Sequence, residues 1–396
     1  MRGKTARVIL FGLVIFTMLL SACAPAATTE APAPTQAQAA TEAPAQPTNT
    51  EAAAPTEAAA TEAPTQAAAT EAPTEAAATE APEATATIPP AACTPLENQP
   101  QVEAGELGSE DNPIVIAFVP SGDTGRITKA GEEIADCLNQ MTGLSFEIEV
   151  GTSFAASIEA LGAEKAQVGF LNTFSVLLAQ QKYDIVPALA VLRKYNTNDV
   201  DPDKDQAGTL LPYYKGQFIA ATDSGITEFA DLKGKSFCFV DPNSTSGYII
   251  PRIILAANGV DPDTDLTASV NAGSHNNVAI GVYNGDCDAG VTFIDVLTDS
   301  AANLKEKYPD IADKVKAFAV TDRIPNDGVQ FIKTLDPEIQ TAIKEGMIAM
   351  AEDPGGNAVL RGLYSINGFQ EIDASFYADF AEVLKAAGVD PAELVK

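Results

Sequence analysis

The residues best suited to binding chemistry lie at 240–247, where three hydroxyl side chains follow a strand pattern and open a helix pattern. The run before them is apolar and β-prone, and residues 248–256 have the apolar spacing of a helix. The first turn of a helix leaves backbone N–H groups without partners and carries a partial positive charge. Ser244, Thr245 and Ser246 add hydroxyls there, so the segment predicts a site for a small tetrahedral oxyanion. The alternative is an ordinary Ser/Thr helix cap, and the local pattern does not separate the two.

Strand and helix patterns alternate along much of the chain. Strands are expected at 113–120, 145–150, 167–171, 184–192, 236–240, 267–271 and 288–293. A run that starts at 217–222 is expected to cross into a second α/β unit, and 315–320 to lead back out. Further helices are expected at 126–141, 154–165, 173–181, 276–283, 336–351 and 375–387. This alternation with short connections predicts an α/β fold with mostly parallel sheets. The chain is long enough for two such lobes, each with its own core, joined by two crossings and facing a cleft.

The first 22 residues have the pattern of a secretory signal peptide. Three basic residues precede an apolar run at 8–20, and its ~13 residues are too few to span a membrane comfortably. The run ends in Leu20-Ser21-Ala22-Cys23, which resembles a bacterial lipobox. The resemblance implies cleavage before Cys23 and lipidation of its thiol and new amine. A plain signal peptide with a cysteine near its cleavage site is the alternative.

Residues 23–92 are expected to be a disordered tether. Between 24 and 90 the sequence is almost entirely Ala, Thr, Glu, Pro and Gln, with a loose Thr-Glu-Ala-Pro repeat. A segment with almost no large apolar side chains cannot offset an ordering entropy of ~1–2 kcal/mol per residue. Repeated proline and like charge keep such a chain extended, so it predicts a spacer between a membrane and a folded domain. Glycosylation of its threonines stays open.

The formal net charge of −30 limits the classes of partner. The folded part has an acidic composition without a basic patch, which argues against nucleic acid and against anionic lipid head groups. The segment 196–208 is rich in aspartate, and Asp201, Asp203 and Asp205 alternate in loose resemblance to a calcium loop. The glycine and the terminal glutamate of that motif are missing, so a solvated surface loop is predicted. One histidine and no Cys-x-x-Cys spacing also argue against a metal site.

With Cys23 assigned to lipid, four cysteines remain in a chain that carries an export signal. An even number of cysteines in an exported domain predicts two disulfides, and four cysteines allow three pairings. The favoured pairing joins Cys93 to Cys137, fixing the end of the tether to the first helix, and Cys238 to Cys287, joining two neighbouring strands.

Several motifs together resemble the phosphate, phosphite and phosphonate solute-binding proteins of ABC importers. They are the runs 231–235 and 239–248, supported by 158–161, 168–170, 271–275, 285–290 and 324–327, and the similarity spans about 114 to 369. The resemblance implies the two-lobed, type II periplasmic binding protein fold, which closes on its ligand like a hinged clamp. Lobe 1 would take residues 93–216, lobe 2 residues 217–318, and residues 319–396 would return to lobe 1.

The resemblance also implies roles for particular residues. Ser244, Thr245 and Ser246 would hold the phosphorus-bound oxygens, and His275 would donate a hydrogen bond to the same group. Asp295 would accept a proton from the ligand and so favour a protonated oxyanion over sulfate, which has no proton to give.

Three further positions are expected at the ligand. Tyr214 matches a family tyrosine at the first crossing and would close over the ligand. Phe154 and Thr173 stand in turns where the family often has aromatic hydroxyls, so the preferred ligand stays open among phosphite, phosphate and a small phosphonate.

The function expected from these features is that of a solute-binding lipoprotein outside the cytoplasm, anchored to the cell membrane through Cys23. It would deliver a phosphorus oxyanion to an ABC permease and its ATPase, without a cofactor and without enzymatic activity. A module that feeds a sensor, or one that binds a sulfonate or a thiamine precursor, stays an alternative. A hydrolase using Ser244, His275 and Asp295 is disfavoured because the strand–turn–helix lacks a Gly-x-Ser-x-Gly elbow.

Overall fold

The computed structural model describes residues 89–391. The expected signal peptide, Cys23 and all but the last residues of the expected tether lie outside the described residues. At the start of the described range, the backbone N–H of Ala92 donates to the Asp353 carboxylate at 3.1 Å. Ordered contacts therefore begin slightly before the boundary expected at 93.

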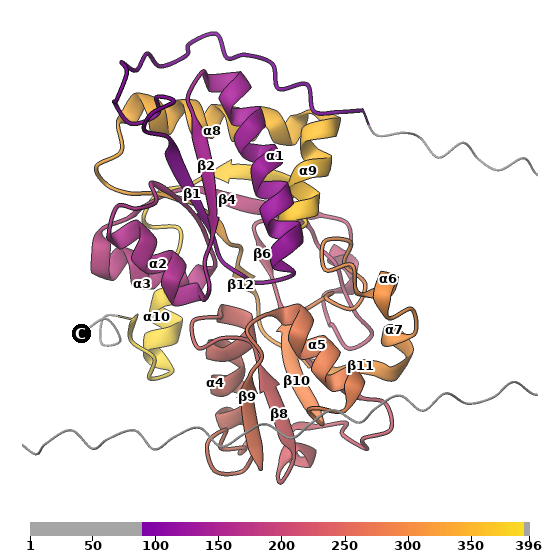
Figure 1. Cartoon of the computed structure of the whole chain (residues 1–396). Coiled ribbons are helices and arrows are strands. Elements are labelled where there is room, and N and C mark those ends of the chain that lie inside the picture. Colours follow the sequence, from indigo (N-terminus) through magenta and orange to yellow (C-terminus); the bar gives the residue numbers. More distant parts are fainter. Residues whose placement is uncertain (1–88, 392–396) are drawn as a thin grey trace, which may run out of the picture. The chain divides into compact units, whose positions relative to one another are not determined.

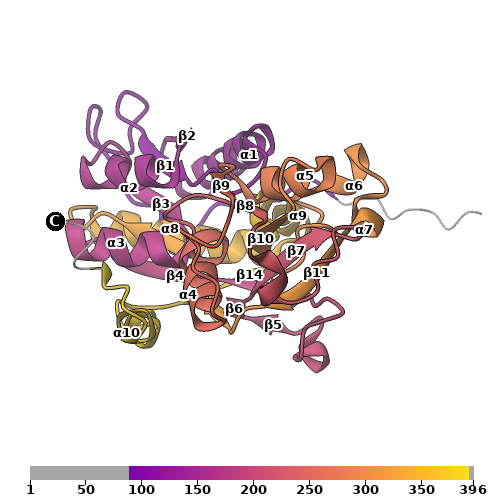
Figure 2. The same ribbon diagram turned by 90° about the horizontal axis from the view of Figure 1, so that it is seen from below.

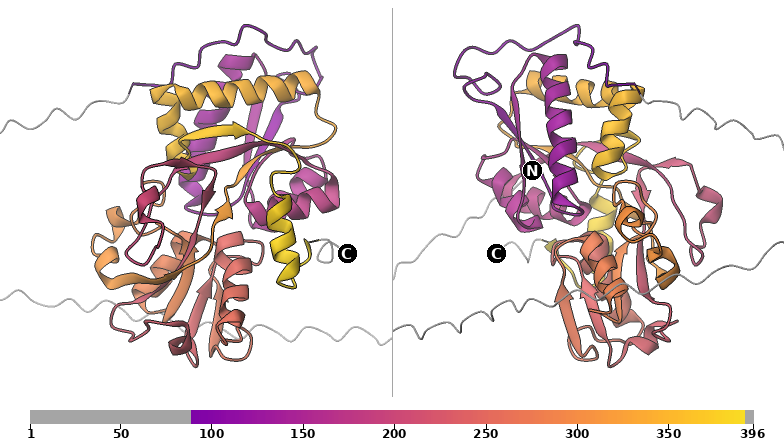
Figure 3. Two further views of the ribbon diagram at one scale, coloured as in Figure 1. Left: turned by 180° about the vertical axis from the view of Figure 1, so that it is seen from behind. Right: turned by 45° about the vertical axis from the view of Figure 1, so that its right-hand side comes forward.

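The first lobe is built on a seven-stranded sheet in the order β14-β4-β13-β3-β1-β2, with β5 paired to β4. Its strands are β1 (Ile114–Phe118), β2 (Phe146–Val150), β3 (Val168–Leu171), β4 (Val186–Lys194), β5 (Leu210–Leu211), β13 (Gly328–Phe331) and β14 (Gly368–Glu371). Two groups of helices pack on it (Figure 1): α2 (Phe154–Gly162) with α3 (Thr173–Tyr183), and α1 (Thr124–Thr142) with α8 (Pro337–Glu352) and α9 (Pro354–Tyr364). The last helix, α10 (Ala378–Ala386), follows β14, which lies beside β4 at the edge of the sheet (Figure 3).

The second lobe is built on a five-stranded sheet in the order β11-β7-β10-β8-β9. Its strands are β7 (Gly216–Ala221), β8 (Ser236–Phe239), β9 (Ala268–Asn271), β10 (Ala289–Phe293) and β11 (Val315–Val320). Helices α4 (Ile250–Ala257) and α5 (His275–Asn284) lie on opposite faces of this sheet (Figure 2), and two short helices, α6 (Leu304–Lys307) and α7 (Ile311–Lys314), precede β11. Buried aromatic side chains fill one face of the sheet, with Phe218 stacked edge-on against Phe229.

The two crossings between the lobes pair with each other. In the first crossing, β6 (Tyr213–Tyr214) runs antiparallel to β12 (Ile324–Pro325) of the second crossing (Figure 1). The α/β class and the two-lobed arrangement expected from the sequence are confirmed. The lobe boundaries at 217 and 318 stay a proposal that follows the strands of the second sheet.

The expectation of mostly parallel sheets is wrong, because seven of the eleven strand pairings among the described residues are antiparallel. Strands β2 and β3 run parallel to β1, and β9 and β10 run parallel to β8. In contrast, β13 runs antiparallel to β3 and β4, and β7 runs antiparallel to β10 and β11. Both β13 and β7 directly follow a crossing, so they start at the edge of the sheet where the parallel strands end. A strand that starts there must run against its neighbours.

Several elements were not expected from the sequence. The short strands β12, β13 and β14 and the helices α6, α7 and α9 are absent from the predicted set. Helix α9 begins with Pro354-Gly355-Gly356, a composition typical of a turn, but the Asp353 carboxylate caps it by accepting the Gly356 N–H at 2.7 Å. Gly355 also packs against the backbone of Pro90, where a Cβ would lie 2.4 Å from backbone atoms.

Both favoured disulfides are present. Cys93 is bonded to Cys137 of α1 with a Cα–Cα distance of 5.1 Å, and Cys238 of β8 is bonded to Cys287, just before β10, with a Cα–Cα distance of 5.8 Å. The first disulfide therefore fixes the start of the folded part to α1. The second joins neighbouring strands of the second sheet.

The prediction of a solvated loop at 196–208 is confirmed for most of the segment, whose residues are largely exposed, but it is wrong for Asp201. Asp201 is only 2% exposed, and its carboxylate accepts a hydrogen bond from the Lys215 ammonium at 2.8 Å. Lys215 lies between β6 and β7, on the first crossing, and also pairs with Asp203 at 2.9 Å. Asp203 in turn pairs with Arg323, which precedes β12 on the second crossing. The aspartate pattern alone could not reveal this role, because both basic partners are distant in sequence.

We predict that Asp201→Asn lowers the free energy of unfolding by up to about 3 kcal/mol, because it leaves the buried Lys215 with only Asp203 as a charged partner. Urea unfolding of both proteins measures the difference. Asp263→Asn is the matched control: Asp263 pairs with Arg252 but its side chain is 70% exposed, so the change should cost less than about 1 kcal/mol. Equal losses in the two variants would contradict a special role for the buried pair.

Candidate functional site

A cavity of about 360 Å³ lies where the loops of both sheets meet. It is lined from the first lobe by residues that include Phe154, Asn172 and Arg193, and from the second by Ser244, Thr245, Ser246, His275 and Asp295. Tyr213 and Tyr214 of the first crossing and Asp327, just after the second crossing, also line it. The sequence-predicted residues therefore gather around one cavity, with Thr173 as the exception.

The three predicted hydroxyl residues stand at the start of a helix that opens with a single π-helical turn, Thr245–Ile249, before α4. The Ser244 hydroxyl caps this turn by accepting the Gly247 N–H at 3.2 Å. Pro251 has no backbone N–H, so it cannot form the usual α-helical bond to Gly247, and the first turn closes through wider bonds such as Ile249 N–H to the Ser244 carbonyl. The sequence pattern predicted a regular helix here and missed this widened turn.

Gly247 lets the helix start approach β8 closely. A Cβ at this position would lie 2.3 Å from Cγ2 of Val240 and 2.7 Å from the Ser244 hydroxyl. Any larger residue would push the helix start away from the strand and disturb the capping hydroxyl. The glycine of the 240–247 segment is therefore needed to place the hydroxyls at the cavity.

Thr245 connects this helix start to the first lobe. Its hydroxyl oxygen accepts the side-chain N–H of Asn172 and the backbone N–H of Phe174, both at 2.9 Å. A hydroxyl has two lone pairs and one hydrogen, so an oxygen that accepts twice keeps its O–H to donate. Two groups of the first lobe therefore orient the Thr245 hydroxyl of the second lobe as a hydrogen-bond donor. Tyr214, from the first crossing, places its hydroxyl 3.3 Å from that of Ser246.

His275 is the first residue of α5 and is 5% exposed. Its Nδ1 accepts the backbone N–H of Phe293 at 3.1 Å, so in the neutral ring Nε2 carries the proton and can donate it. Burial and the charge of Arg193 lower the pKa of His275 to about 3. The histidine is therefore a neutral hydrogen-bond donor at physiological pH. Its backbone N–H also reaches the first lobe, donating to the Ser121 carbonyl at 3.0 Å.

Asp295 follows β10 and is partly buried at the cavity wall. Its carboxylate accepts a hydrogen bond from the side chain of Asn196 in the first lobe. Burial and the neighbouring Asp299 carboxylate raise the pKa of Asp295 to about 7. Both its protonated and its ionised form are accessible near neutral pH, so it can accept a proton from a ligand.

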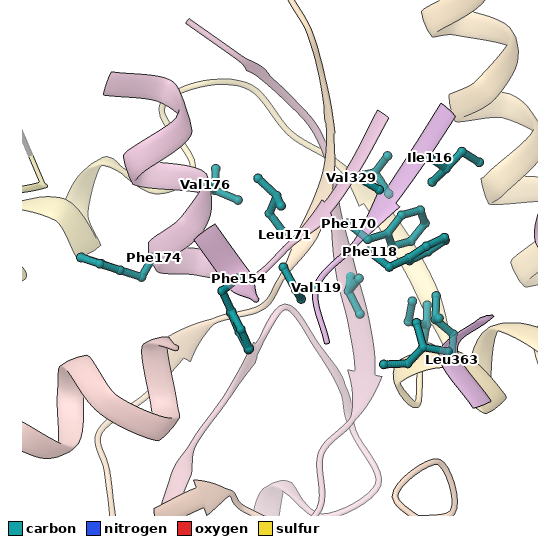
Figure 4. Close-up of a cluster of buried hydrophobic side chains, with 14 of the residues drawn as sticks. Ile116, Phe118, Val119, Phe154, Phe170, Leu171, Phe174, Val176, Val329 and Leu363 are labelled. Atoms are coloured by element: carbon teal, nitrogen blue, oxygen red, sulfur yellow. The ribbon is translucent and has the colours of Figure 1, made fainter. Parts of the chain in front are cut away.

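Phe154 and Thr173, both expected at the ligand, differ in where their side chains lie. The Phe154 side chain lines the cavity and is 1% exposed, beside the apolar cluster that includes Phe118 and Phe170 (Figure 4). Thr173, in contrast, is buried away from the cavity lining, and its hydroxyl donates to the Pro325 carbonyl at 2.6 Å. In this structure Thr173 holds the first lobe to the second crossing.

The sequence analysis missed one charged pair at the cavity. Arg193 at the end of β4 donates from Nη2 to Oδ2 of Asp327 at 3.0 Å. Asp327 lies in the 324–327 run that supported the resemblance, but no role was assigned to it. The place of Arg193 in the sequence could have predicted its location at the cavity. It directly follows an apolar strand run, and polar residues at the carboxyl ends of strands line clefts in α/β folds.

Two α/β lobes joined by paired crossings, with a polar cavity between them, define the class of two-lobed periplasmic binding proteins. A family model described as "ABC transporter, phosphonate, periplasmic substrate-binding protein" matches residues 116–377. The chain belongs to this family. It is therefore the extracytoplasmic, substrate-binding component of an ABC importer.

Two curated relatives are similar in sequence. The phosphate-import protein PhnD of Mycolicibacterium smegmatis is 26% identical over 253 residues, which cover 59% of this chain and 74% of that protein. The phosphonates-binding periplasmic protein of Escherichia coli is 30% identical over 156 residues, which cover 38% of this chain and 45% of that protein.

Two solved structures share the fold. A binding protein component of an ABC phosphonate transporter from Pseudomonas aeruginosa superposes with a TM-score of 0.59 at 20% identity, covering 71% of this chain and 92% of that one. PhnD1 from Prochlorococcus marinus, solved with methylphosphonate, gives a TM-score of 0.58 at 14% identity, covering 69% of this chain and 98% of that one.

Two kinds of feature are absent among residues 89–391. Within that range, no group of three or more His, Cys, Asp or Glu side chains is placed to hold a metal ion. None of the helices in the same range has the length and apolar character needed to cross a membrane.

We predict that His275 makes stability fall in acid. Its pKa is about 3 in the folded protein and ~6.5 in the unfolded chain. Below pH 6.5 the unfolded chain therefore binds a proton at His275 that the folded protein does not bind. This contribution to stability is complete above pH 6.5 and is lost as pH falls toward 3, by up to about 1.4 kcal/mol per pH unit.

The measurement is urea unfolding between pH 7.5 and 4.5 for the wild type and for His275→Gln. His275 is the single histidine of the chain, so the variant has none, and the difference between the two pH curves isolates this group. The wild type should lose more stability in acid than the variant. Parallel curves would contradict the buried, neutral histidine.

Proposed function

We propose that this protein captures a phosphorus oxyanion in the cavity between its lobes, as a lipoprotein that presents the ligand to an ABC permease and its ATPase. The observation that carries the proposal is the Thr245 hydroxyl, whose lone pairs accept two N–H groups of the first lobe, so that its hydrogen is left to donate. Ser244, Ser246 and Nε2 of His275 add further polar groups around the same cavity. Such a set suits an acceptor-rich, tetrahedral oxyanion.

The size of the cavity favours a phosphonate with an organic substituent over a bare oxyanion. Cavities of about 300–1,000 Å³ are typical of sites for small organic ligands, and this one measures about 360 Å³. A phosphate or phosphite group would fill a small part of it. PhnD1 from Prochlorococcus marinus, which shares the fold, was solved in complex with methylphosphonate, and this supports the same ligand class.

Anchoring through lipid on Cys23 is part of the proposal. It rests on the lipobox-like sequence and on the long spacer that follows it. A tether of this composition would hold the folded lobes at a distance from the membrane while leaving them free to reach the permease.

The arrangement of side chains disfavours the hydrolase alternative. In a Ser-His-Asp triad the aspartate accepts the Nδ1 hydrogen of the histidine. Here Nδ1 of His275 accepts the Phe293 N–H instead, and Asp295 is hydrogen-bonded to Asn196. The Ser244 hydroxyl is engaged as a helix cap.

Calorimetry with the purified protein tests the proposed function. The ligands are methylphosphonate, 2-aminoethylphosphonate, phosphate, phosphite and sulfate. At least one phosphonate should bind more tightly than phosphate, and sulfate should bind least. Binding of none of the phosphorus compounds would refute the proposal.

We predict that Thr245→Ala and Ser246→Ala each weaken phosphonate binding by about 1–3 kcal/mol, the range for a lost hydrogen bond to a charged group. For Thr245 the change also removes an acceptor shared with Asn172 and Phe174, so lobe closure should be less favourable. Calorimetric affinities are compared with those of Thr267→Ala, an exposed hydroxyl outside the cavity lining. Unchanged affinity in both cavity variants would exclude the helix start as the binding site.

We predict that Asp295→Asn relaxes discrimination against sulfate. A carboxylate facing the ligand needs a proton from it, whereas an asparagine amide can donate an N–H to a fully ionised anion. The ratio of phosphonate affinity to sulfate affinity should fall on the order of tenfold. Competition titrations measure this ratio, with Asp263→Asn as an exposed control of equal charge change. A ratio that stays constant would remove Asp295 from ligand selection.

A further inference from the structure

The Arg193–Asp327 pair is the feature of the cavity that the proposed function leaves without a role. Arg193 is the next-to-last residue of β4 in the first lobe, and Asp327 follows the second crossing. Their side chains are 17% and 22% exposed, and both residues line the cavity. The pair could serve only to stabilise the fold, or Arg193 could also bind the ligand. The groups around Arg193 decide between these two roles.

The surroundings place the guanidinium close to the predicted oxyanion site. The Arg193 Cζ lies 5.6 Å from the centre of the Tyr214 ring, and the Tyr214 hydroxyl lies 3.3 Å from that of Ser246. The positive charge of Arg193 also lowers the pKa of His275. The guanidinium is therefore near both the hydroxyls and the histidine of the second lobe, although it belongs to the first.

Arg193 has unused hydrogen-bonding capacity. A guanidinium carries five N–H donors, and among the described residues its side chain makes one hydrogen bond, from Nη2 to Asp327. Its Nε and the Oδ1 of Asp327 are buried without a hydrogen-bond partner. Asp327 therefore fixes the guanidinium through Nη2 and leaves most of its N–H donors for another acceptor.

The charge of the ligand supplies the reason for such an arrangement. The three hydroxyls and the neutral His275 carry no formal positive charge, and Asp295 and Asp299 on the same cavity wall are acidic. A cation on the cavity wall would stabilise a phosphorus oxyanion bound there, because burying a charge without a partner is costly. Arg126, Lys194 and Arg361 also line the cavity, and Arg193 is the cation that an ion pair with Asp327 holds beside Tyr214. Guanidinium groups bind such oxyanions with two parallel hydrogen bonds.

We propose that Arg193, held by Asp327, binds the phosphorus oxyanion directly from the first lobe, opposite the helix start at Ser244–Ser246. The inference rests on the proposed function and adds a residue to it. The ligand is then gripped by hydroxyls of one lobe and by a guanidinium of the other, so binding favours the closed arrangement. The site requires an anionic ligand group that can accept from both sides.

The test measures the affinity of the purified protein for methylphosphonate by calorimetry. Arg193→Met should weaken binding on the order of 10- to 100-fold. Arg193→Lys keeps the positive charge but cannot form two parallel hydrogen bonds, so its affinity should lie between those of the wild type and Arg193→Met. Arg252→Met is the matched control, since Arg252 pairs with Asp263 outside the cavity lining and its loss changes the net charge equally. The control should bind as the wild type does.

Removing one member of a buried pair leaves the other unpaired, so Arg193→Met alone could fail to fold. The double variant with Asp327→Asn avoids that charge and should show the same loss of affinity. A second readout is the titration of His275 followed by NMR, which reports one residue because the chain has one histidine. Arg193→Met should raise its pKa, as expected if the guanidinium lies close to the ligand groups.

Wild-type affinity in the double variant would overturn the inference, and so would an equal loss in Arg252→Met, which would indicate a general effect of charge. If the wild type binds methylphosphonate and the Arg193 variants bind it equally well, the proposed function stands and the role of Arg193 is wrong. If neither methylphosphonate nor any other phosphorus compound binds the wild type, the proposed function itself fails, and this inference fails with it.

Discussion

The hydrogen bonds to the Thr245 hydroxyl are the interaction on which the site depends. They join the helix start of the second lobe to Asn172 and Phe174 at the start of α3 in the first. Because the hydroxyl accepts from both groups, these two hydrogen bonds orient its own O–H. The contact between the lobes and the orientation of this hydroxyl therefore depend on one oxygen atom. His275 adds a second contact between the lobes, because its backbone N–H donates to Ser121 of the first lobe.

The topology explains why these groups meet. In each sheet the parallel strands end toward the cleft, and the strand that follows a crossing starts there and runs the opposite way. Loops and helix starts that follow the parallel strands are thus gathered at one edge of each sheet, as expected for ligand sites in α/β folds. The crossings are held by the buried pair of Asp201 and Lys215 and by Asp203, which contacts both crossings through Lys215 and Arg323.

A chain with a net charge of −30 can still bind an anion because the local groups are donors. Hydroxyls, a neutral histidine and a guanidinium act over the length of a hydrogen bond, whereas the acidic surface is screened beyond about 10 Å at moderate ionic strength. The surface charge would slow the approach of an anion without removing the site.

The sequence by itself determined the elements and the local chemistry. Apolar spacing located most strands and helices, and the hydroxyl run at 244–246 with its glycine identified the helix start, because these are properties of neighbouring residues. Only the tertiary structure decided which distant groups meet. It paired Arg193 with Asp327, buried Asp201 against Lys215, and turned Thr173 toward Pro325, away from the cavity. These contacts join residues far apart in the chain, and they follow from the register and direction of strands, which no local pattern encodes.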